Sequence, residues 1–297
     1  MNANSRITQQ SMAQQALLGL EANQSKLALL QQRMSSGKQI SKPSDDPGGA
    51  ASALKLRSEV ARNAQWTRNA DDGLGWLGAI DTTLTGMTDQ VRRARDLVLQ
   101  GLSTGSTSPE SRKALATEIE GLRASLLGSA NSGYLGRPLF GGTTSGTAAY
   151  DAASGAYVGD GNPVARTVGA NARVRVDITG PEAFGPAGSD LFSVLADIST
   201  SLRTDPTQLN GDLVALDGVM KNMITTLADV GVRYNRVDQM RTAADDHKVD
   251  VEATLSGIED IDVAKTTLDL SVQRAAYQAA LQATAHIVQP SLLDFLK

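Results

Sequence analysis

Cysteine is absent from this 297-residue chain, and other residue classes are scarce. Without a thiol the chain has no disulfide, no thiolate metal ligand and no cysteine nucleophile. Aromatic residues make up only 4% of the sequence, so we expect Ala and Leu helix seams, rather than a large globular core, to provide most of the packing. No run of about 18 apolar residues predicts a membrane-spanning helix. A net charge of -4 provides no basic surface for nucleic acid.

The first 20 residues lack the basic start, apolar centre and small-residue cleavage site of a Sec signal. We therefore expect either a cytoplasmic protein or one that leaves the cell by a route that needs no cleaved signal.

Two helical stripes of apolar residues lie at opposite ends of the chain. The first consists of Ile7, Ala16, Leu20, Leu27, Leu30 and Met34, and the second of Ile258, Ile261, Leu268, Val272, Ala275 and Ala279. A helix with an apolar stripe needs a partner, and a solvated coiled coil normally carries Glu and Lys beside its seam. Here Gln and Asn replace most of the charges near the N-terminus, and Arg274 is the only charged residue in 270–293. We interpret both ends as helices that pair with each other while also packing against neighbouring subunits.

Long helices are predicted between these ends. A break at 42–49, where Ser44 or Asp46 can cap the next helix, precedes a helical tract over about 50–100. Its clearest stripe alternates spacings of three and four: Leu77, Ile80, Leu84, Met87, Val91, Ala94 and Val98. Ser108-Pro109-Glu110 starts a third helix that ends near 131–133.

The region 134–188 is rich in Gly, Thr, Pro and Ser, and the alternation over 173–178 predicts a half-buried strand. We expect a small β-rich insertion that leans on the helices. A helix resumes at Ser189, and the longest helix is predicted after Asp205-Pro206. Its stripe consists of Leu213, Leu216, Met220, Met223, Leu227, Val230, Tyr234 and Val237. Gly257 is expected to break this helix, and Pro290 to end the last one.

These patterns predict a mainly α fold with a small β-rich insertion, an elongated antiparallel helical bundle or coiled coil made from both chain ends. The expected domains are terminal coiled-coil segments (1–42 and 257–297), a long-helix bundle (43–133 and 189–256) and the β-rich insertion (134–188).

Several motifs can suggest chemistry. Gly73-Leu74-Gly75-Trp76-Leu77-Gly78 matches G-x-G-x-x-G, but a dinucleotide site needs a preceding strand, and helical periodicity surrounds this match. Ser35-Ser36-Gly37-Lys38 matches S-x-x-K without the partner motifs of a serine acylase. The glycine-rich segment 142–146 lacks the lysine of a phosphate-binding loop. Helix contacts and turns explain all three better.

Titratable residues do not assemble an active site either. His247 and His286 are predicted on different helices, and each fits a surface position better than a metal site. Adjacent carboxylates, as in Asp45-Asp46, do not face one site, and helix capping is their expected role. The sequence therefore predicts no enzyme, no cofactor and no metal.

Four segments carry a family resemblance. The segment 34–47, which ends in Pro43-Ser44-Asp45-Asp46-Pro47, resembles the N-terminal signature of flagellins and hook–filament junction proteins. The segments 72–77, 136–142 and 291–296 resemble, in turn, the helix that follows, the turn into the β-domain and the C-terminal end. The Pro-Ser-Asp-Asp-Pro form is more similar to the junction proteins than to the flagellins.

The resemblance implies an extracellular structural adaptor of the bacterial flagellum, exported unfolded by the flagellar type III system and escorted by a chaperone. Copies of it would form a ring between hook-associated protein 1 and the first flagellin subunits. The terminal segments would be disordered in the monomer and would form an inner coiled-coil tube on assembly. The loop containing Pro43, Ser44, Asp45, Asp46 and Pro47 would join the inner and outer layers. The expected assembly interface consists of Ile7, Leu20, Leu27, Leu30, Met34, Ile258, Ile261, Leu268, Val272, Leu292, Leu293, Phe295 and Leu296.

Two alternatives remain open at this point. Flagellin itself would polymerise from seeds into long filaments, whereas a junction protein would stop at a ring or short stack. A cytoplasmic coiled-coil signalling protein would keep ordered terminal helices in the free monomer and would not be exported.

Overall fold

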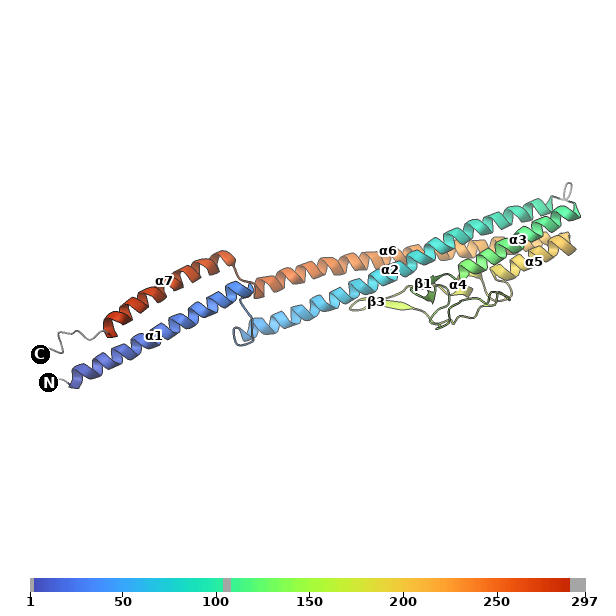
Figure 1. Ribbon diagram of the computed structural model, residues 1–297. Helices are drawn as coiled ribbons and strands as arrows, with labels where there is room; N and C mark the ends of the chain where they lie inside the picture. Colours follow the sequence, from blue (N-terminus) through green and yellow to red (C-terminus); the bar gives the residue numbers. More distant parts are fainter. Residues whose placement is uncertain (1–2, 104–107, 289–297) are drawn as a thin grey trace. The chain divides into compact units, whose positions relative to one another are not determined.

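The computed structural model describes residues 3–103 and 108–288, with the side chains of 3–10, 13 and 286–288 left out. Seven helices and two small hairpins lie within this part of the chain (Figure 1). In order they are α1 (Ala3–Ser36), α2 (Pro47–Leu102), α3 (Pro109–Ala130), β1 (Gly133–Tyr134), β2 (Arg137–Pro138), β3 (Ala165–Gly169), β4 (Ala172–Arg175), α4 (Gly180–Phe184), α5 (Leu191–Thr204), a 3₁₀ turn (Pro206–Gln208), α6 (Leu209–Glu259) and α7 (Val263–Val288). The predicted mainly α fold with a small β-rich insertion is confirmed.

The chain divides into two compact units, and both boundaries fall inside long helices. One unit comprises residues 1–61 and 248–297, and the other residues 62–247. The expected three-part division places its boundaries elsewhere, at 42/43, 133/134, 188/189 and 256/257, and it stays a prediction.

In the 62–247 unit, α2 and α6 form an antiparallel seam. All seven residues of the predicted α2 stripe, from Leu77 to Val98, are at most 1% exposed. On α6 the fully buried positions recur every seven residues, as Leu209, Leu216, Met223, Val230 and Val237. A repeat of seven is typical of coiled-coil packing. Ion pairs from Asp71 to Arg241 and from Arg95 to Asp217 fix the antiparallel direction.

Caps define the shorter helices of this unit. Ser108 accepts a hydrogen bond from the Ser111 N–H and starts α3, with Pro109 in the first turn as predicted. Asp190, rather than Ser189, caps α5 through the N–H groups of Phe192 and Ser193. Helices α3 and α5 pack against each other.

The insertion consists of the hairpins β1–β2 and β3–β4 joined by turns around a cluster of rings. Tyr150 is central to this cluster, with its ring centroid 4.8 Å from that of Phe192, 5.3 Å from Tyr157 and 5.9 Å from Phe184. The cluster belongs to the same hydrophobic core as the helices, so the insertion does lean on them.

Three predicted boundaries were wrong. The longest helix is α2, with 56 residues against 51 for α6. Gly257 does not break α6, which continues to Glu259, because a helix tolerates a single glycine at a cost of about 1 kcal/mol. Strand β4 ends at Arg175, because Asp177 turns inward and accepts hydrogen bonds from the Val164 N–H and the Arg175 Nε.

Candidate assembly interface

The two ends of the chain meet along a seam between α1 and α7. On α1 the half-buried residues of this seam are Ala16, Leu20, Asn23, Leu27 and Leu30. Asn23 joins the apolar positions because Gln273 Nε2 of α7 donates to its backbone oxygen at 3.2 Å and to its Oδ1 at 3.1 Å. Leu20, Leu27 and Leu30 are therefore engaged within one copy of the chain, while Met34 is 36% exposed.

The face of α7 that meets α1 differs from the predicted stripe. Its buried and half-buried residues are Thr266, Leu270, Gln273, Tyr277, Ala280 and Thr284, spaced alternately by four and three. Leu268 and Val272 are 64% and 60% exposed, and Ala275 and Ala279 are exposed too. The prediction that this stripe forms the pairing face was wrong. The actual seam mixes polar with apolar residues, so a count of apolar positions alone misses it.

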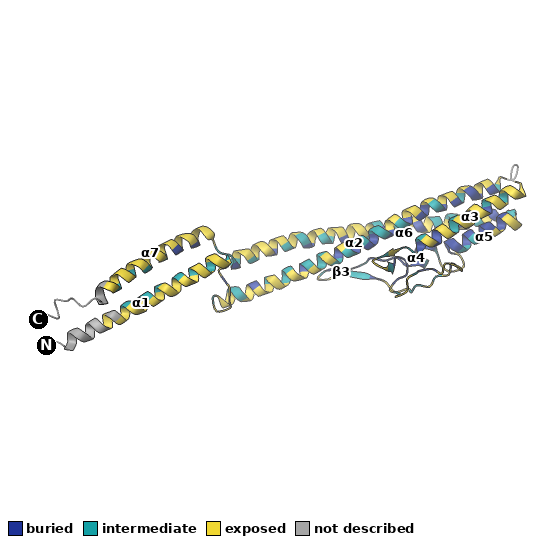
Figure 2. Cartoon of the chain, in the orientation of Figure 1, coloured by how far each residue is buried: buried dark blue, intermediate teal, exposed yellow. Residues whose placement is uncertain are grey.

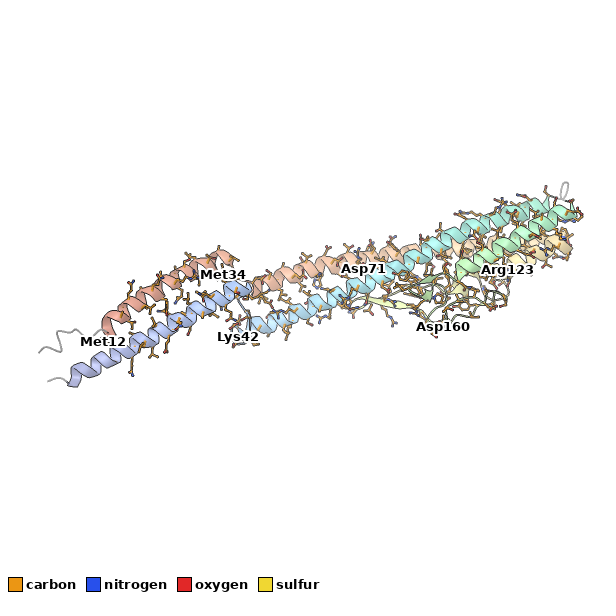
Figure 3. All side chains as sticks on the ribbon, in the orientation of Figure 1. Met12, Met34, Lys42, Asp71, Arg123 and Asp160 are labelled. Carbon is orange, nitrogen blue, oxygen red and sulfur yellow. The ribbon has the colours of Figure 1, made fainter. Side chains whose placement is uncertain are left out.

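The predicted stripe forms an apolar face on the opposite side of α7. At 3.6 residues per turn, Leu268, Val272, Ala275 and Ala279 lie about half a turn away from the seam. We call these four residues the outer α7 face. Leu17, Leu18 and Leu29 of α1 are likewise 49%, 65% and 37% exposed. Figure 2 shows that exposed residues dominate both terminal helices, and Figure 3 shows side chains projecting from them on several sides.

The remaining predicted interface residues lie elsewhere. Ile258 is at the end of α6 and Ile261 in the segment that leads into α7, and both are half-buried. Ile7 lies in α1, but its side chain is outside the described part. Leu292, Leu293, Phe295 and Leu296 also lie outside the described residues.

A cluster that we call the terminal junction joins the segments where α1 and α6 end. The Gln39 N–H donates to the Glu259 oxygen at 2.6 Å, and the Ile261 N–H donates to the Gly37 oxygen at 3.1 Å. Between them Lys38 Nζ lies 2.6 Å from Asp260 Oδ1, an ion pair that raises the pKa of Lys38 and lowers that of Asp260. The Glu259 carboxylate, almost fully buried, also receives Arg57 Nε at 2.8 Å.

The loop before α2 is held by its two aspartates, which act separately. Asp45 Oδ2 accepts from the N–H groups of Ser41 and Lys42, and these bonds hold the Asp45 pKa below its ordinary value. Asp46 Oδ1 accepts from the N–H groups of Gly48 and Gly49 at 3.0 Å and so caps α2, where Ser44 had been an equal candidate. The expected capping role therefore holds for Asp46, whereas Asp45 holds the loop itself.

The motifs that suggested chemistry have structural roles. The G-x-G-x-x-G match lies wholly inside α2 with no strand before it, and Trp76 within it is buried. Asp71 and Asp72 pair with different arginines, Arg241 and Arg166. His247 is exposed on α6. Over residues 3–103 and 108–288, no cluster of acidic and histidine side chains suits a metal ion, and no helix is long and apolar enough to cross a membrane.

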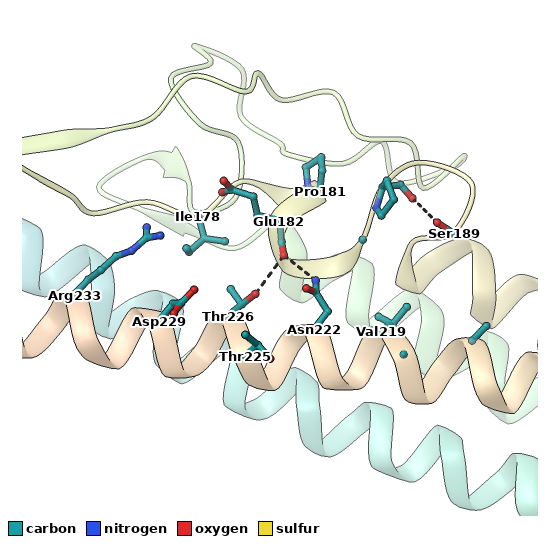
Figure 4. A pocket seen from close by; sticks show the side chains of 14 residues that line it. Ile178, Pro181, Glu182, Ser189, Val219, Asn222, Thr225, Thr226, Asp229 and Arg233 are labelled. Atoms are coloured by element: carbon teal, nitrogen blue, oxygen red, sulfur yellow. Dashed lines mark hydrogen bonds between the residues drawn. The ribbon is translucent and has the colours of Figure 1, made fainter.

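A groove of about 630 Å³ lies between α4 and α6 (Figure 4). Asn222 and Thr226 of α6 donate to the Glu182 backbone oxygen there, and Arg233 donates to that of Asp177. These side chains fasten the insertion to α6. Sequence reasoning missed them, because polar residues on a long helix carry no local signal of a distant backbone partner.

Comparison with known proteins shows which family this chain resembles in sequence and fold. The model of the bacterial flagellin N-terminal helical region matches residues 7–145, and that of the C-terminal helical region matches residues 213–296. Flagellar hook-associated protein 3 of Escherichia coli K12 is 27% identical, over 98% of this chain and 100% of the relative. Flagellin FlaB2 of Treponema pallidum is also 27% identical, over 90% and 91%. A solved structure of a flagellar hook-associated protein from Vibrio parahaemolyticus is 26% identical and superposes with a TM-score of 0.66, over 73% of this chain and all of the other.

Proposed function

Because this chain belongs to the bacterial flagellin family and is a structural protein of the hook–filament junction, we propose that its copies form a ring that joins hook-associated protein 1 to the first flagellins. Export through the flagellar type III system, with a chaperone, belongs to the same proposal. So does the absence of catalytic activity, which is supported by the structural roles of the motifs described above.

The outer α7 face carries the proposal. Large apolar side chains that stay exposed in a folded chain mark a surface that another protein covers. Leu268 and Val272 point away from the seam with α1 and stay 64% and 60% exposed, so no residue in the described part of one copy covers them. We assign the predicted interface residues to two roles: Leu20, Leu27 and Leu30 hold α1 on α7, and Leu268 and Val272 contact neighbouring subunits.

The loop from Pro43 to Pro47 is proposed as the connection between the inner and outer layers. Its support is the internal hydrogen bonding of Asp45 and Asp46, which gives the chain a defined path into α2. Leu292, Leu293, Phe295 and Leu296 remain proposed interface residues. Replacing Leu293 and Phe295 with Ser should abolish incorporation and leave the melting temperature of the monomer almost unchanged.

Paired variants of α7 test the proposal. The double variant Leu268→Ser, Val272→Ser should keep the monomer's melting temperature and lose incorporation between hook-associated protein 1 and flagellin. The matched variant Leu270→Ser acts inside the seam and should lower the stability of the α1–α7 pair by about 2 kcal/mol or more, measured by amide exchange in α7. Normal incorporation of the double variant would contradict the assignment.

Flagellin is the competing function, since a flagellin is as similar in identity over slightly less of the chain. Electron microscopy of seeded, purified protein separates the two: rings or short stacks fit the junction role, and long filaments would overturn it. A cytoplasmic signalling protein does not fit membership of this family.

A further inference from the structure

Helix α1 has an outer face of its own, on the side away from α7. It consists of Leu18, Ala22, Ser25 and Leu29, all of them exposed. We call these four residues the outer α1 face. They recur with spacings of four, three and four, which is also the spacing of the outer α7 face. Such a spacing marks a helix face that packs against another helix. The α1–α7 pair therefore carries one helix-packing surface on each side.

The two outer faces lie at the same level along the pair. The hydrogen bonds from Gln273 to Asn23 place these residues side by side in the antiparallel seam. From that point one residue forward on α1 corresponds to one residue back on α7, so Leu29 is level with residue 267. This position is one residue, or about 1.5 Å, from Leu268 at the end of the outer α7 face. A second copy set beside the first with almost no shift along the helix axes therefore brings its outer α1 face against the outer α7 face.

The side chains of the two faces complement each other at this match. The opposed pairs are Leu18 with Ala279, Ala22 with Ala275, Ser25 with Val272, and Leu29 with Leu268. Three of the four pairs contain a small side chain, so the two helices can approach closely. The fourth pair joins two leucines, and their burial supplies much of the apolar contact.

Charges beside the faces support the same match. Lys26 lies about a quarter turn from the outer α1 face, and Asp269 lies about a quarter turn from the outer α7 face in the same rotational sense. Both are exposed, and neither is paired with another residue in the described part of the chain. In an antiparallel match both fall on the same edge of the contact, within about 3 Å of each other along the helix axis. Flanking charges of opposite sign select the partner and orientation of packed helices.

The placement of the two faces also favours a closed ring. At about 100° per residue, each outer face is centred slightly less than half a turn, about 150°, around its helix from the seam. Both faces deviate from half a turn in the same rotational sense. Because α1 and α7 are antiparallel, both faces therefore tilt toward the same side of the pair. A row of copies joined through them curves toward that side.

We infer that the outer α7 face of one copy packs on the outer α1 face of the next, with Lys26 and Asp269 paired across the contact. The two faces differ, so each copy offers one of each. Contacts of this heterologous kind build rings when the rotation closes and helical stacks when it does not. The inference rests on the proposed function and names the partner of the outer α7 face, which is a second copy of this chain rather than hook-associated protein 1 or flagellin.

The absence of cysteine allows a direct test of this contact. One preparation carries Ala22→Cys and another Ala275→Cys; the two are mixed, assembled with hook-associated protein 1 and flagellin, and oxidised. We expect a disulfide-linked dimer of the two chains at least tenfold more abundant than in a control mixture where Gln24→Cys replaces Ala22→Cys. Gln24 is exposed at nearly the same level but lies about a third of a turn off the outer α1 face. Assembly without this preferential link overturns the inference alone, whereas failure of the unmodified chain to assemble overturns the proposed function.

Reversal of the flanking charges separates this contact from folding. Lys26→Glu and Asp269→Lys should each leave amide exchange in α1 and α7 nearly unchanged, because both side chains are exposed in one copy. Each should weaken self-association about fivefold or more, because like charges then meet across the contact. The chain with both substitutions restores opposite charges and should regain the original self-association to within about twofold. Single variants that associate normally, or a double variant as weak as the single ones, overturn the inference, as does a loss of binding confined to hook-associated protein 1 or flagellin.

Discussion

Lys38 Nζ and Asp260 Oδ1 lie 2.6 Å apart although 222 residues separate them in the sequence. Lys38 follows the end of α1, and Asp260 follows the end of α6. The backbone hydrogen bonds from Gln39 to Glu259 and from Ile261 to Gly37 flank the pair, which makes a short antiparallel bridge. The end of α1 and the start of α7 are therefore held at one point, and the α1–α7 seam extends from there.

The Lys38–Asp260 pair should stabilise the terminal junction over a defined pH range. The Asp260 pKa is lowered in the folded chain. The stability that Asp260 contributes is therefore fully present above the pKa of an unfolded Asp, about 3.9, and is lost as the pH falls through the folded pKa. The Lys38 pKa is raised in the folded chain. The stability that Lys38 contributes is therefore fully present below the pKa of an unfolded Lys, about 10.4, and is lost as the pH rises through the folded pKa. A double-mutant cycle with Lys38→Met and Asp260→Asn at pH 7 should give a coupling of no more than about 1 kcal/mol, because both side chains are about 40% exposed. A coupling that is unchanged in high salt would contradict an ion pair.

Two glycines of α2, three residues apart, should respond oppositely to alanine. A Cβ at Gly78 would meet nothing within 4 Å, so Gly78→Ala should stabilise the chain by up to about 1 kcal/mol through helix propensity. A Cβ at Gly75 would overlap the Tyr134 hydroxyl and push that ring off Trp76. Gly75→Ala should therefore destabilise the chain by about 1–3 kcal/mol. Urea unfolding of both variants checks the signs, and equal shifts would disprove the close approach of Tyr134.

The insertion should lose stability in acid through protonation of Glu182. Burial alone would raise the pKa of Glu182, but the Arg175 guanidinium, 2.7 Å away, and the Thr179 N–H lower it to about 2. The stability that Glu182 contributes to the insertion is therefore fully present above about pH 4.3 and is lost as the pH falls through about 2. Solvent screening limits it to about 1 kcal/mol, because the side chain is 45% exposed.

Near-ultraviolet circular dichroism of the ring cluster during acid titration measures this loss. Arg175→Met keeps the carboxylate but removes its cation, so the transition should move to higher pH. Glu182→Gln should flatten the transition. An acid transition that is the same in all three proteins would assign the effect to another group.

Much of the bundle is visible in the sequence because burial there is continuous. From Leu77 to Val98 every seam position is apolar and every predicted residue is buried. On α7, by contrast, the helix has one apolar and one mixed face, and α1 packs on the mixed one through Gln273 and Tyr277. Apolar periodicity locates a helix face that must pack against another surface. It does not show whether that surface belongs to the same chain or to a neighbouring subunit.

The sequence by itself determined most of the helices, the cap at Ser108, the β-rich insertion and the resemblance to the flagellin family, because these depend on local spacing and short motifs. Only the tertiary structure decided which face of α7 meets α1, which side chains fasten the insertion to α6, and that the Asn63 amide is buried without a hydrogen-bond partner. Those outcomes depend on groups that are far apart in the chain. The free energy of burying a helix face or an amide depends on the groups that pack against it. Only folding brings those groups into contact.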